Sequence, residues 1–240
     1  MSLSFEKKRI LYAAVYPFLF ILLLWLIGVL QFGMSWNLSF FGIRPRNLTG
    51  IIGIFTNCFI HADINHLWAN TLSSFVLMWF LFYFYHRIAW SALGGLWLLT
   101  GALLWSIGRS GVHVGASGLV YGLAFFLFFS GVLRRKISLM AVSLVVTFLY
   151  GSIVWGMMPF AELIKPDMSW EGHLSGAVSG AVMSLLLMNK GPQREEPFDS
   201  ESDEDEENPD EENPFWAIPD NENLLNVKPP NRRENPEDVL

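Results

Sequence analysis

The chain of 240 residues has little cysteine and little charge. Its single cysteine, Cys58, excludes an intramolecular disulfide framework, and a buried free thiol is its expected state. Charged residues make up 16% of the chain, whereas hydrophobic residues make up 52% and aromatic residues 15%. A soluble domain of this size is normally less apolar and more charged. The composition therefore predicts a membrane protein with several spans.

Acidic residues are scarce in the first part of the chain. Of 22 acidic residues, 17 lie from Lys190 onward, where only 5 basic residues oppose them and the net charge is −12. The residues before Lys190 have a net charge of +6. We therefore predict a membrane domain over residues 1–190 and an acidic, proline-rich, disordered cytoplasmic tail over residues 191–240. The tail is expected to be a solvated spacer or, around Phe215 and Trp216, to bind an unknown cytoplasmic partner.

Long apolar runs predict six transmembrane helices. The first run, residues 10–30, follows three basic residues and has no evident small-x-small cleavage site, so we expect a retained helix and not a removed signal peptide. The other runs cover residues 69–85, 88–107, 116–133, 137–158 and 174–188. The expected fold class is an all-α membrane protein.

The basic residues of the membrane domain fall on alternate loops. The loops in question carry Lys7, Lys8, Arg9, Arg87, Arg134, Arg135, Lys136, Lys190 and Arg194. The positive-inside rule assigns such loops to the cytoplasm. We therefore expect an integral multi-pass protein, in the plasma (inner) membrane, with both termini cytoplasmic. Arg44, Arg46 and Arg109 lie on the opposite, outer loops against this trend.

Three polar residues are expected at one depth in the membrane. Asn70, Ser117 and His173 each lie 16 or 17 residues from the basic cytoplasmic end of their helix. At about 1.5 Å per residue this is roughly 24–26 Å, just inside the outer edge of a hydrocarbon core about 30 Å thick. His66 lies one turn above Asn70 on the same helical face. A polar side chain at this depth costs free energy unless it is hydrogen-bonded or serves a function. The presence of several such side chains at one depth therefore favours a functional site.

Small residues surround two members of this set. Ser117 lies in Gly115-Ala116-Ser117-Gly118, where the glycines leave its hydroxyl open to a close neighbour or a substrate. His173 shares a helical stripe with Gly176 and Gly180, which lets a neighbouring helix approach closely. This approach would bring His173 within hydrogen-bond reach of a side chain on that helix. A serine beside an imidazole is an activated nucleophile.

Three motifs in this order resemble the rhomboid family of intramembrane serine proteases. They are His66-Leu-Trp-Ala-Asn70, Gly115-Ala-Ser117-Gly118 with Tyr121, and Gly172-His173 with its glycine stripe. The resemblance covers roughly residues 1–190. It implies a six-helix rhomboid-like bundle in which Ser117 is the nucleophile and His173 its general base. It also implies that the enzyme cleaves transmembrane segments of membrane-protein substrates near the outer leaflet, within the lipid bilayer and without a cofactor.

The resemblance assigns supporting roles as well. His66, Asn70 and the Ser117 backbone N–H would form the oxyanion hole, and Tyr121 would support the His173 ring. The remaining supporting positions are His61, which matches a further histidine of some members, and the small residues Gly115, Gly118, Gly176 and Gly180. One departure is the first outer loop, where residues 40–46 lack the tryptophan-arginine pair that some bacterial members carry.

Each of these residues also has a simpler structural explanation, from helix packing to interhelical hydrogen bonding. A metal site formed by His61, His66, His113 and His173 is disfavoured, because no pair has His-x-x-x-His spacing and no set of cysteines accompanies them. A catalytically silent, client-binding rhomboid-like protein is the first alternative function, although the serine, the histidine and the oxyanion candidates argue against it. A small transporter is the second alternative function. A transporter would more often show paired ionisable groups at the midplane and an internal repeat, and neither is evident in this sequence. No nucleic-acid partner is expected.

Overall fold

The structure, a computed structural model, describes residues 3–160 and 168–194. Within these ranges the regular structure is helical, with one isolated antiparallel bridge between Ile43 and His113. The predicted all-α fold is therefore confirmed. Most of the predicted acidic tail, residues 195–240, lies outside the described residues, as does the segment 161–167 of the last outer loop.

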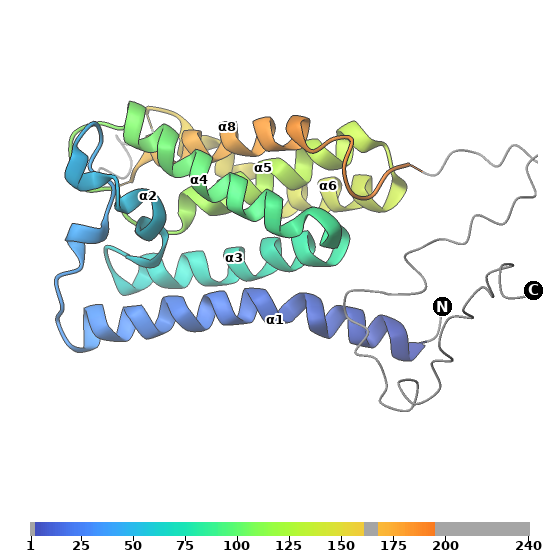
Figure 1. Ribbon diagram of the computed structural model, residues 1–240, viewed down its shortest axis with the longest axis horizontal. Helices are drawn as coiled ribbons and strands as arrows, with labels where there is room; N and C mark the ends of the chain where they lie inside the picture. Colours follow the sequence, from blue (N-terminus) through green and yellow to red (C-terminus); the bar gives the residue numbers. More distant parts are fainter. Residues whose placement is uncertain (1–2, 161–167, 195–240) are drawn as a thin grey trace, which may run out of the picture. The chain divides into compact units, whose positions relative to one another are not determined.

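Six long helices form the bundle and run alternately in opposite directions (Figure 1). They are α1 (Leu3–Gly28), α3 (Ile64–Phe84), α4 (Ala89–Ile107), α5 (Ser117–Arg134), α6 (Ile137–Tyr150) and α8 (Trp170–Leu186). Each helix contains most of one predicted apolar run, so the six-helix prediction is confirmed. The alternation places the start of α5 and the start of α8 at the same end of the bundle, opposite the N-terminus.

Two helices begin earlier than their apolar runs. Asp63 caps α3 by accepting a hydrogen bond from the His66 N–H at 2.9 Å, and Ser169 caps α8 by accepting from the Gly172 N–H at 3.2 Å. Such polar caps satisfy the free amides of a first helical turn. Because the caps precede the apolar residues, His66 and His173 lie within the first turn of their helices.

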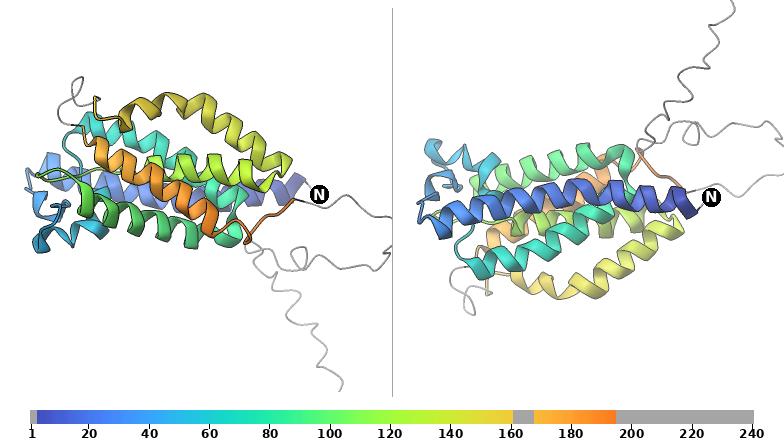
Figure 2. Two further views of the ribbon diagram at one scale, coloured as in Figure 1. Left: turned by 90° about the horizontal axis from the view of Figure 1, so that it is seen from above. Right: turned by 90° about the horizontal axis from the view of Figure 1, so that it is seen from below.

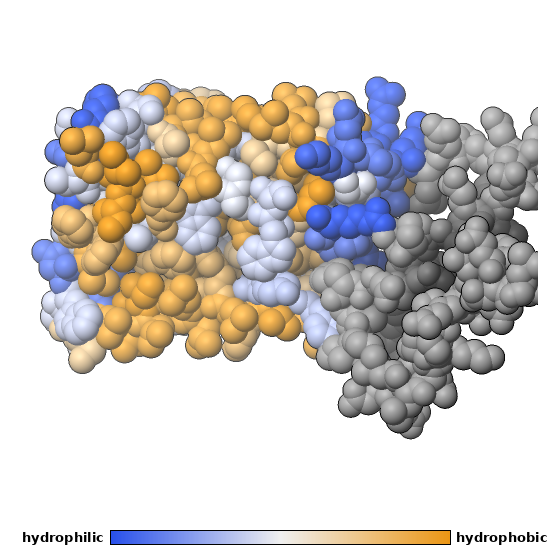
Figure 3. Space-filling model, viewed as in Figure 1, coloured by the Kyte–Doolittle hydropathy of each residue, from blue (hydrophilic) through white to orange (hydrophobic). Residues whose placement is uncertain are grey.

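Five of the helices that the structure describes are long and apolar enough to cross a membrane, and α8 is the remaining long helix. It has 17 residues, many of them glycine and serine, and it packs mostly against α4 and α5. A helix surrounded by protein needs little lipid-facing apolar surface. On the face shown in Figure 3, apolar side chains cover the middle of the bundle and hydrophilic ones gather toward its ends.

The fifth predicted span consists of two kinds of helix. The α-helix α6 ends at Tyr150, and the chain continues as the 3-10 helix η6 (Gly151–Met157). Together they still form one apolar span, Ile137–Met157, as predicted. The change to a 3-10 helix winds the backbone more tightly and redirects its carbonyl groups.

The first outer connection is compact. It contains the π-helical turn η1 (Val29–Gly33), three 3-10 turns, η2 (Ser39–Phe41), η3 (Leu48–Gly50) and η4 (Asn57–Phe59), and the short helix α2 (Gly53–Thr56). The Arg46 guanidinium donates to the carbonyls of Ser106 and Gly108 at the end of α4, at 3.1 and 2.7 Å. These terminal carbonyls have no partner within the helix. Arg46 therefore has a structural use on the outer side, which explains one exception to the charge pattern.

Helix α5 lies at the centre of the bundle and contacts α3, α4, α6 and α8 (Figure 2). Its contact with α8 depends on glycine. A Cβ added at Gly176 would lie 2.0 Å from the Gly118 carbonyl oxygen, and one at Gly180 would lie 2.5 Å from that of Gly122. The close helix approach predicted from the glycine stripe is therefore present, and it joins the helix of Ser117 to the helix of His173.

Candidate active site

Ser117 and His173 face each other across the α5–α8 contact. The distance from Ser117 Oγ to His173 Nε2 is 3.0 Å, which is a hydrogen bond. Ser117 is the first residue of α5 and is half-buried, whereas the His173 side chain is 7% exposed. The structure thus brings a partly accessible hydroxyl against a buried imidazole.

The second ring nitrogen of His173 contacts the backbone of η6. His173 Nδ1 lies 2.8 Å from the Gly156 carbonyl oxygen. A carbonyl oxygen can only accept, so Nδ1 carries the hydrogen and the lone pair of Nε2 faces Ser117. The serine hydroxyl then donates to Nε2. The Gly156 carbonyl thus orients the His173 imidazole, in the position that a carboxylate takes in a three-residue triad.

Tyr121 holds the other side of this arrangement. Its ring stacks on the His173 ring with centroids 4.2 Å apart and an angle of 5° between the planes. Its hydroxyl donates to the Ile153 carbonyl at 2.7 Å, so η6 accepts one hydrogen bond from Tyr121 and one from His173. A Cβ at Gly156 would lie 2.2 Å from the Tyr121 hydroxyl, so a larger residue at this position would displace the Tyr121 side chain.

His66 lies directly against the backbone that precedes Ser117. A Cβ added at Gly115 would be 2.6 Å from His66 Cε1 and 2.9 Å from its Nε2. Asn70 is buried one turn further along α3, and its side-chain amide donates to the His66 carbonyl at 3.0 Å. One of the two N–H bonds of Asn70 is therefore used within α3, and the second remains for another acceptor.

His61 lies on the same side of the site, in the loop before α3. Its ring is 5.2 Å from the His66 ring in an edge-to-face arrangement, and its Nε2 accepts from the Ala116 N–H at 3.4 Å. The carbonyl of His61 accepts a hydrogen bond from the Gln31 side chain. His61 and His66 therefore lie against residues 115 and 116, directly before Ser117.

A further hydrogen-bonded chain joins the loop before Ser117 to the start of α8. His113 Nε2 donates to the Arg109 carbonyl at 2.9 Å, so its Nδ1 accepts from the Ser169 hydroxyl at 2.7 Å. The Ser169 oxygen also caps α8. Beside this chain, Glu171 is 3% exposed and lies 3.7 Å from Arg109 Nε. Both links tie the segment leading to Ser117 to the helical turn that carries His173.

Sequence reasoning missed two parts of this site. The Gly156 carbonyl is a backbone group, and no side-chain pattern marks its orientation. The sequence suggests His113 only as a disfavoured metal ligand, and its hydrogen bond to Ser169 was missed. The one available signal is that Ser169 lies just before the last apolar run, where a serine commonly caps a helix. In the part of the chain that the structure describes, no three His, Cys, Asp or Glu side chains are grouped to hold a metal ion.

We expect Gly115→Ala to damage the site more than Gly111→Ala does. Both glycines have a positive φ, 116° and 144°, so both substitutions strain the backbone, but only at Gly115 does the new methyl group meet the His66 ring. Gly111 has open space around it. Melting temperature and activity per folded molecule should both fall further in the Gly115 variant. Equal losses in the two variants would contradict a role for the His66 contact.

Burial of His61 predicts a dependence of stability on pH. Burial, with a smaller effect of His66, lowers the pKa of His61 from 6.5 to about 4. Between these values the unfolded chain binds a proton that the folded protein does not, so stability should fall as the pH drops through this window. His61→Gln keeps an acceptor for the Ala116 N–H but does not titrate. It should therefore make the fall of melting temperature between about pH 6.5 and 4 less steep, and an unchanged slope would contradict the assignment.

Comparison with known proteins agrees with the motifs. The Rhomboid domain family model matches residues 46–190. An uncharacterized protein of Mycobacterium tuberculosis is 37% identical over 183 residues, which cover 73% of this chain and 75% of the relative, and the values for a protein of Mycobacterium bovis are the same. An uncharacterized protein of Mycobacterium leprae is 33% identical over 184 residues, covering 73% of this chain and 71% of the relative.

Proposed function

Because the chain belongs to the rhomboid family, we propose that it is an intramembrane serine endopeptidase that cleaves transmembrane segments of other membrane proteins. The observation that carries this proposal is the hydrogen bond of 3.0 Å between Ser117 Oγ and His173 Nε2. The Gly156 carbonyl supports it further, because it holds the His173 tautomer that can accept the serine proton.

The proposed reaction follows from these contacts. Ser117 Oγ attacks the carbonyl carbon of the scissile peptide bond while its proton moves to His173 Nε2. The resulting imidazolium keeps its Nδ1 hydrogen bond to Gly156. His173 then gives the proton to the leaving amine, which leaves an acyl group on Ser117. A water molecule then loses a proton to His173 as its oxygen attacks the acyl carbon. His173 returns this proton to Ser117 Oγ as the acyl bond breaks, which releases the new carboxylic acid and restores the serine.

The oxyanion formed in these steps needs donors close to Ser117. The backbone N–H of Ser117 lies at the first residue of α5, where helix amides have no intrahelical partner. His66 adjoins Gly115, and Asn70 keeps a second N–H, so both are placed for this role in the proposal. Removing one such donor typically costs about 100- to 1,000-fold in turnover.

The proposed location of the cut follows from the position of the site in the bundle. Ser117 and His173 lie near the end opposite the N-terminus. The positive-inside pattern assigns the N-terminal end to the cytoplasm, so the site would lie in the outer half of the membrane. We therefore propose a plasma-membrane enzyme with both termini cytoplasmic that cuts near the outer leaflet.

A silent, client-binding protein would not need this arrangement. Binding alone requires neither a serine held against an imidazole nor a carbonyl that orients the second ring nitrogen. In the simpler packing explanation, Ser117 would bond to a nearby backbone carbonyl, as Ser143 and Thr147 do in α6. The observed partner of Ser117 is instead a base, which favours the hydrolytic function.

The proposal is tested with purified protein in liposomes that also contain a panel of membrane-spanning reporter proteins. We expect at least one reporter to be cut, with the new termini, mapped by mass spectrometry, in the outer part of its span. Cleavage should continue when soluble protease inhibitors without serine reactivity are present. The absence of any product above the level of Ser117→Ala across the panel would contradict the proposal.

A further inference from the structure

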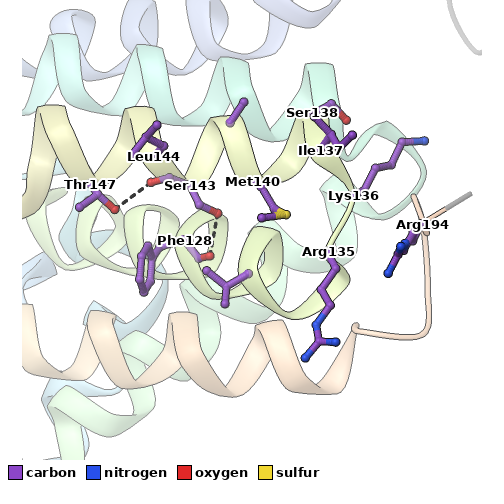
Figure 4. A pocket seen from close by; sticks show the side chains of 12 residues that line it. Phe128, Arg135, Lys136, Ile137, Ser138, Met140, Ser143, Leu144, Thr147 and Arg194 are labelled. Atoms are coloured by element: carbon purple, nitrogen blue, oxygen red, sulfur yellow. Dashed lines mark hydrogen bonds between the residues drawn. The ribbon is translucent and has the colours of Figure 1, made fainter.

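A groove of about 1300 Å³ opens between α5 and α6 near the end of the bundle where these helices join (Figure 4). Its lining comes from α5, from the two-residue link 135–136, from α6 and from Arg194. Ser117 is the first residue of α5, whereas the part of α5 that lines the groove begins at Phe128, about three turns further along the helix. The groove is therefore separate from the candidate active site.

The walls of the groove are suited to hydrocarbon. Val132 of α5 and Leu144 of α6, two of the apolar lining residues, are 50% and 71% exposed. Two hydroxyls in the wall are already bonded: that of Ser143 donates to the Phe128 carbonyl at 2.9 Å, and that of Thr147 donates to the Ser143 carbonyl at 2.8 Å (Figure 4). The third, that of Ser138, lies at the charged end of the groove. A polar occupant would find few donors along this wall.

Positive charge gathers at one end of the groove. Arg135, Lys136 and Arg194 lie at that end, whereas Leu144 and Thr147 lie toward the other (Figure 4). Arg135, the residue that follows α5, has the left-handed conformation, with a φ of 52°, and the chain turns directly into α6. The groove therefore has a cationic end and an apolar wall, and it lies along two membrane-spanning helices.

We propose that this groove binds an anionic phospholipid, with an acyl chain along the α5–α6 wall and the phosphate group between Arg135 and Arg194. Cationic clusters at the cytoplasmic ends of spans attract anionic headgroups, at about 1 kcal/mol per Lys or Arg. The acidic tail also complements this charge and carries Phe198 just after Glu195 and Glu196, so it is the competing occupant that the test below separates from a lipid. The lipid site is independent of the proposed proteolytic function.

The test uses the full-length protein and native mass spectrometry, titrated with phosphatidylglycerol or phosphatidylcholine of the same acyl chains. We expect tighter binding of one phosphatidylglycerol. The double variant Arg135→Gln/Arg194→Gln should bind it about 30-fold more weakly, because two headgroup cations are lost. The matched control Lys7→Gln/Lys8→Gln removes two exposed charges near the start of α1 and should bind as the wild type does.

A second variant tests the channel without changing charge. Ala141→Phe adds a ring to an exposed position in the groove wall and should weaken phosphatidylglycerol binding while the melting temperature in phosphatidylcholine stays unchanged. Equal affinity for the two lipids, or equal losses in the arginine and lysine double variants, would overturn the proposal. It would also be overturned if phosphatidylglycerol bound only after truncation beyond Arg194, because the tail would then be the occupant.

Discussion

Ser117→Ala and His173→Ala are each expected to reduce cleavage of a membrane-spanning reporter to background. Either change removes one partner of the 3.0 Å contact through which the serine proton moves in the proposed mechanism. Groups that act as a unit have non-additive effects, so the double variant should be no slower than either single one. The measurement is the initial rate of cleavage in liposomes, normalised to folded protein.

Ser175→Ala provides the matched control for this experiment. Ser175 lies two residues from His173 on α8 and is 1% exposed, and its hydroxyl has no hydrogen-bond partner among residues 3–160 and 168–194. Its loss should leave the cleavage rate near that of the wild type. Near-wild-type cleavage by Ser117→Ala or by His173→Ala would rule the proposed dyad out.

Asn70→Ala is expected to lower turnover by roughly 10- to 1,000-fold, with little change in apparent substrate binding. The reason is that its free N–H would donate only to the charge that develops in the transition state. A purely structural Asn70 would behave differently, because the His66 carbonyl would lose its side-chain donor. Because the His66 carbonyl keeps its backbone partner in α3, that loss would cost about 0.5–1.5 kcal/mol of stability and leave activity per folded molecule intact.

Turnover and melting temperature should therefore be measured together on Asn70→Ala. Ser74→Ala is the control one turn further along the same face of α3, where the serine is 1% exposed. It should change turnover little. Asn70→Asp extends the test, because an ionised carboxylate cannot donate, so turnover should fall here too. Unchanged turnover per folded molecule in both Asn70 variants would remove Asn70 from the oxyanion hole.

The part of the fold that follows from periodic or continuous apolar residues could be predicted from the sequence. The six helices came from apolar runs, and the close α5–α8 contact came from the glycines around residue 176. The distance of Ser117 and His173 from the basic ends of their helices predicts one level for both, and Ser117 Oγ lies 3.0 Å from His173 Nε2. In each case the feature depends on the type of side chain, or on the lack of one at glycine, and this can be read from the sequence.

The parts that depend on backbone groups could not be predicted. The transition from α6 to η6 turns the Gly156 carbonyl toward His173, and nothing in the apolar run 137–158 indicates where that transition occurs. Arg46 looked like an exception to the charge pattern because its partners are the backbone carbonyls at the end of α4. Hydrogen bonds of this kind depend on where two distant segments meet, which a local pattern does not encode.

The most direct test of the central claim is the labelling of Ser117 by a fluorophosphonate. The purified full-length protein is treated with the reagent in detergent, and the modified residue is identified by peptide mass mapping. We expect one adduct, on Ser117, that is absent from Ser117→Ala, strongly reduced in His173→Ala and undiminished in Ser175→Ala. An unlabelled Ser117 in the folded wild type, or equal labelling of the wild type and His173→Ala, would contradict a serine activated by His173.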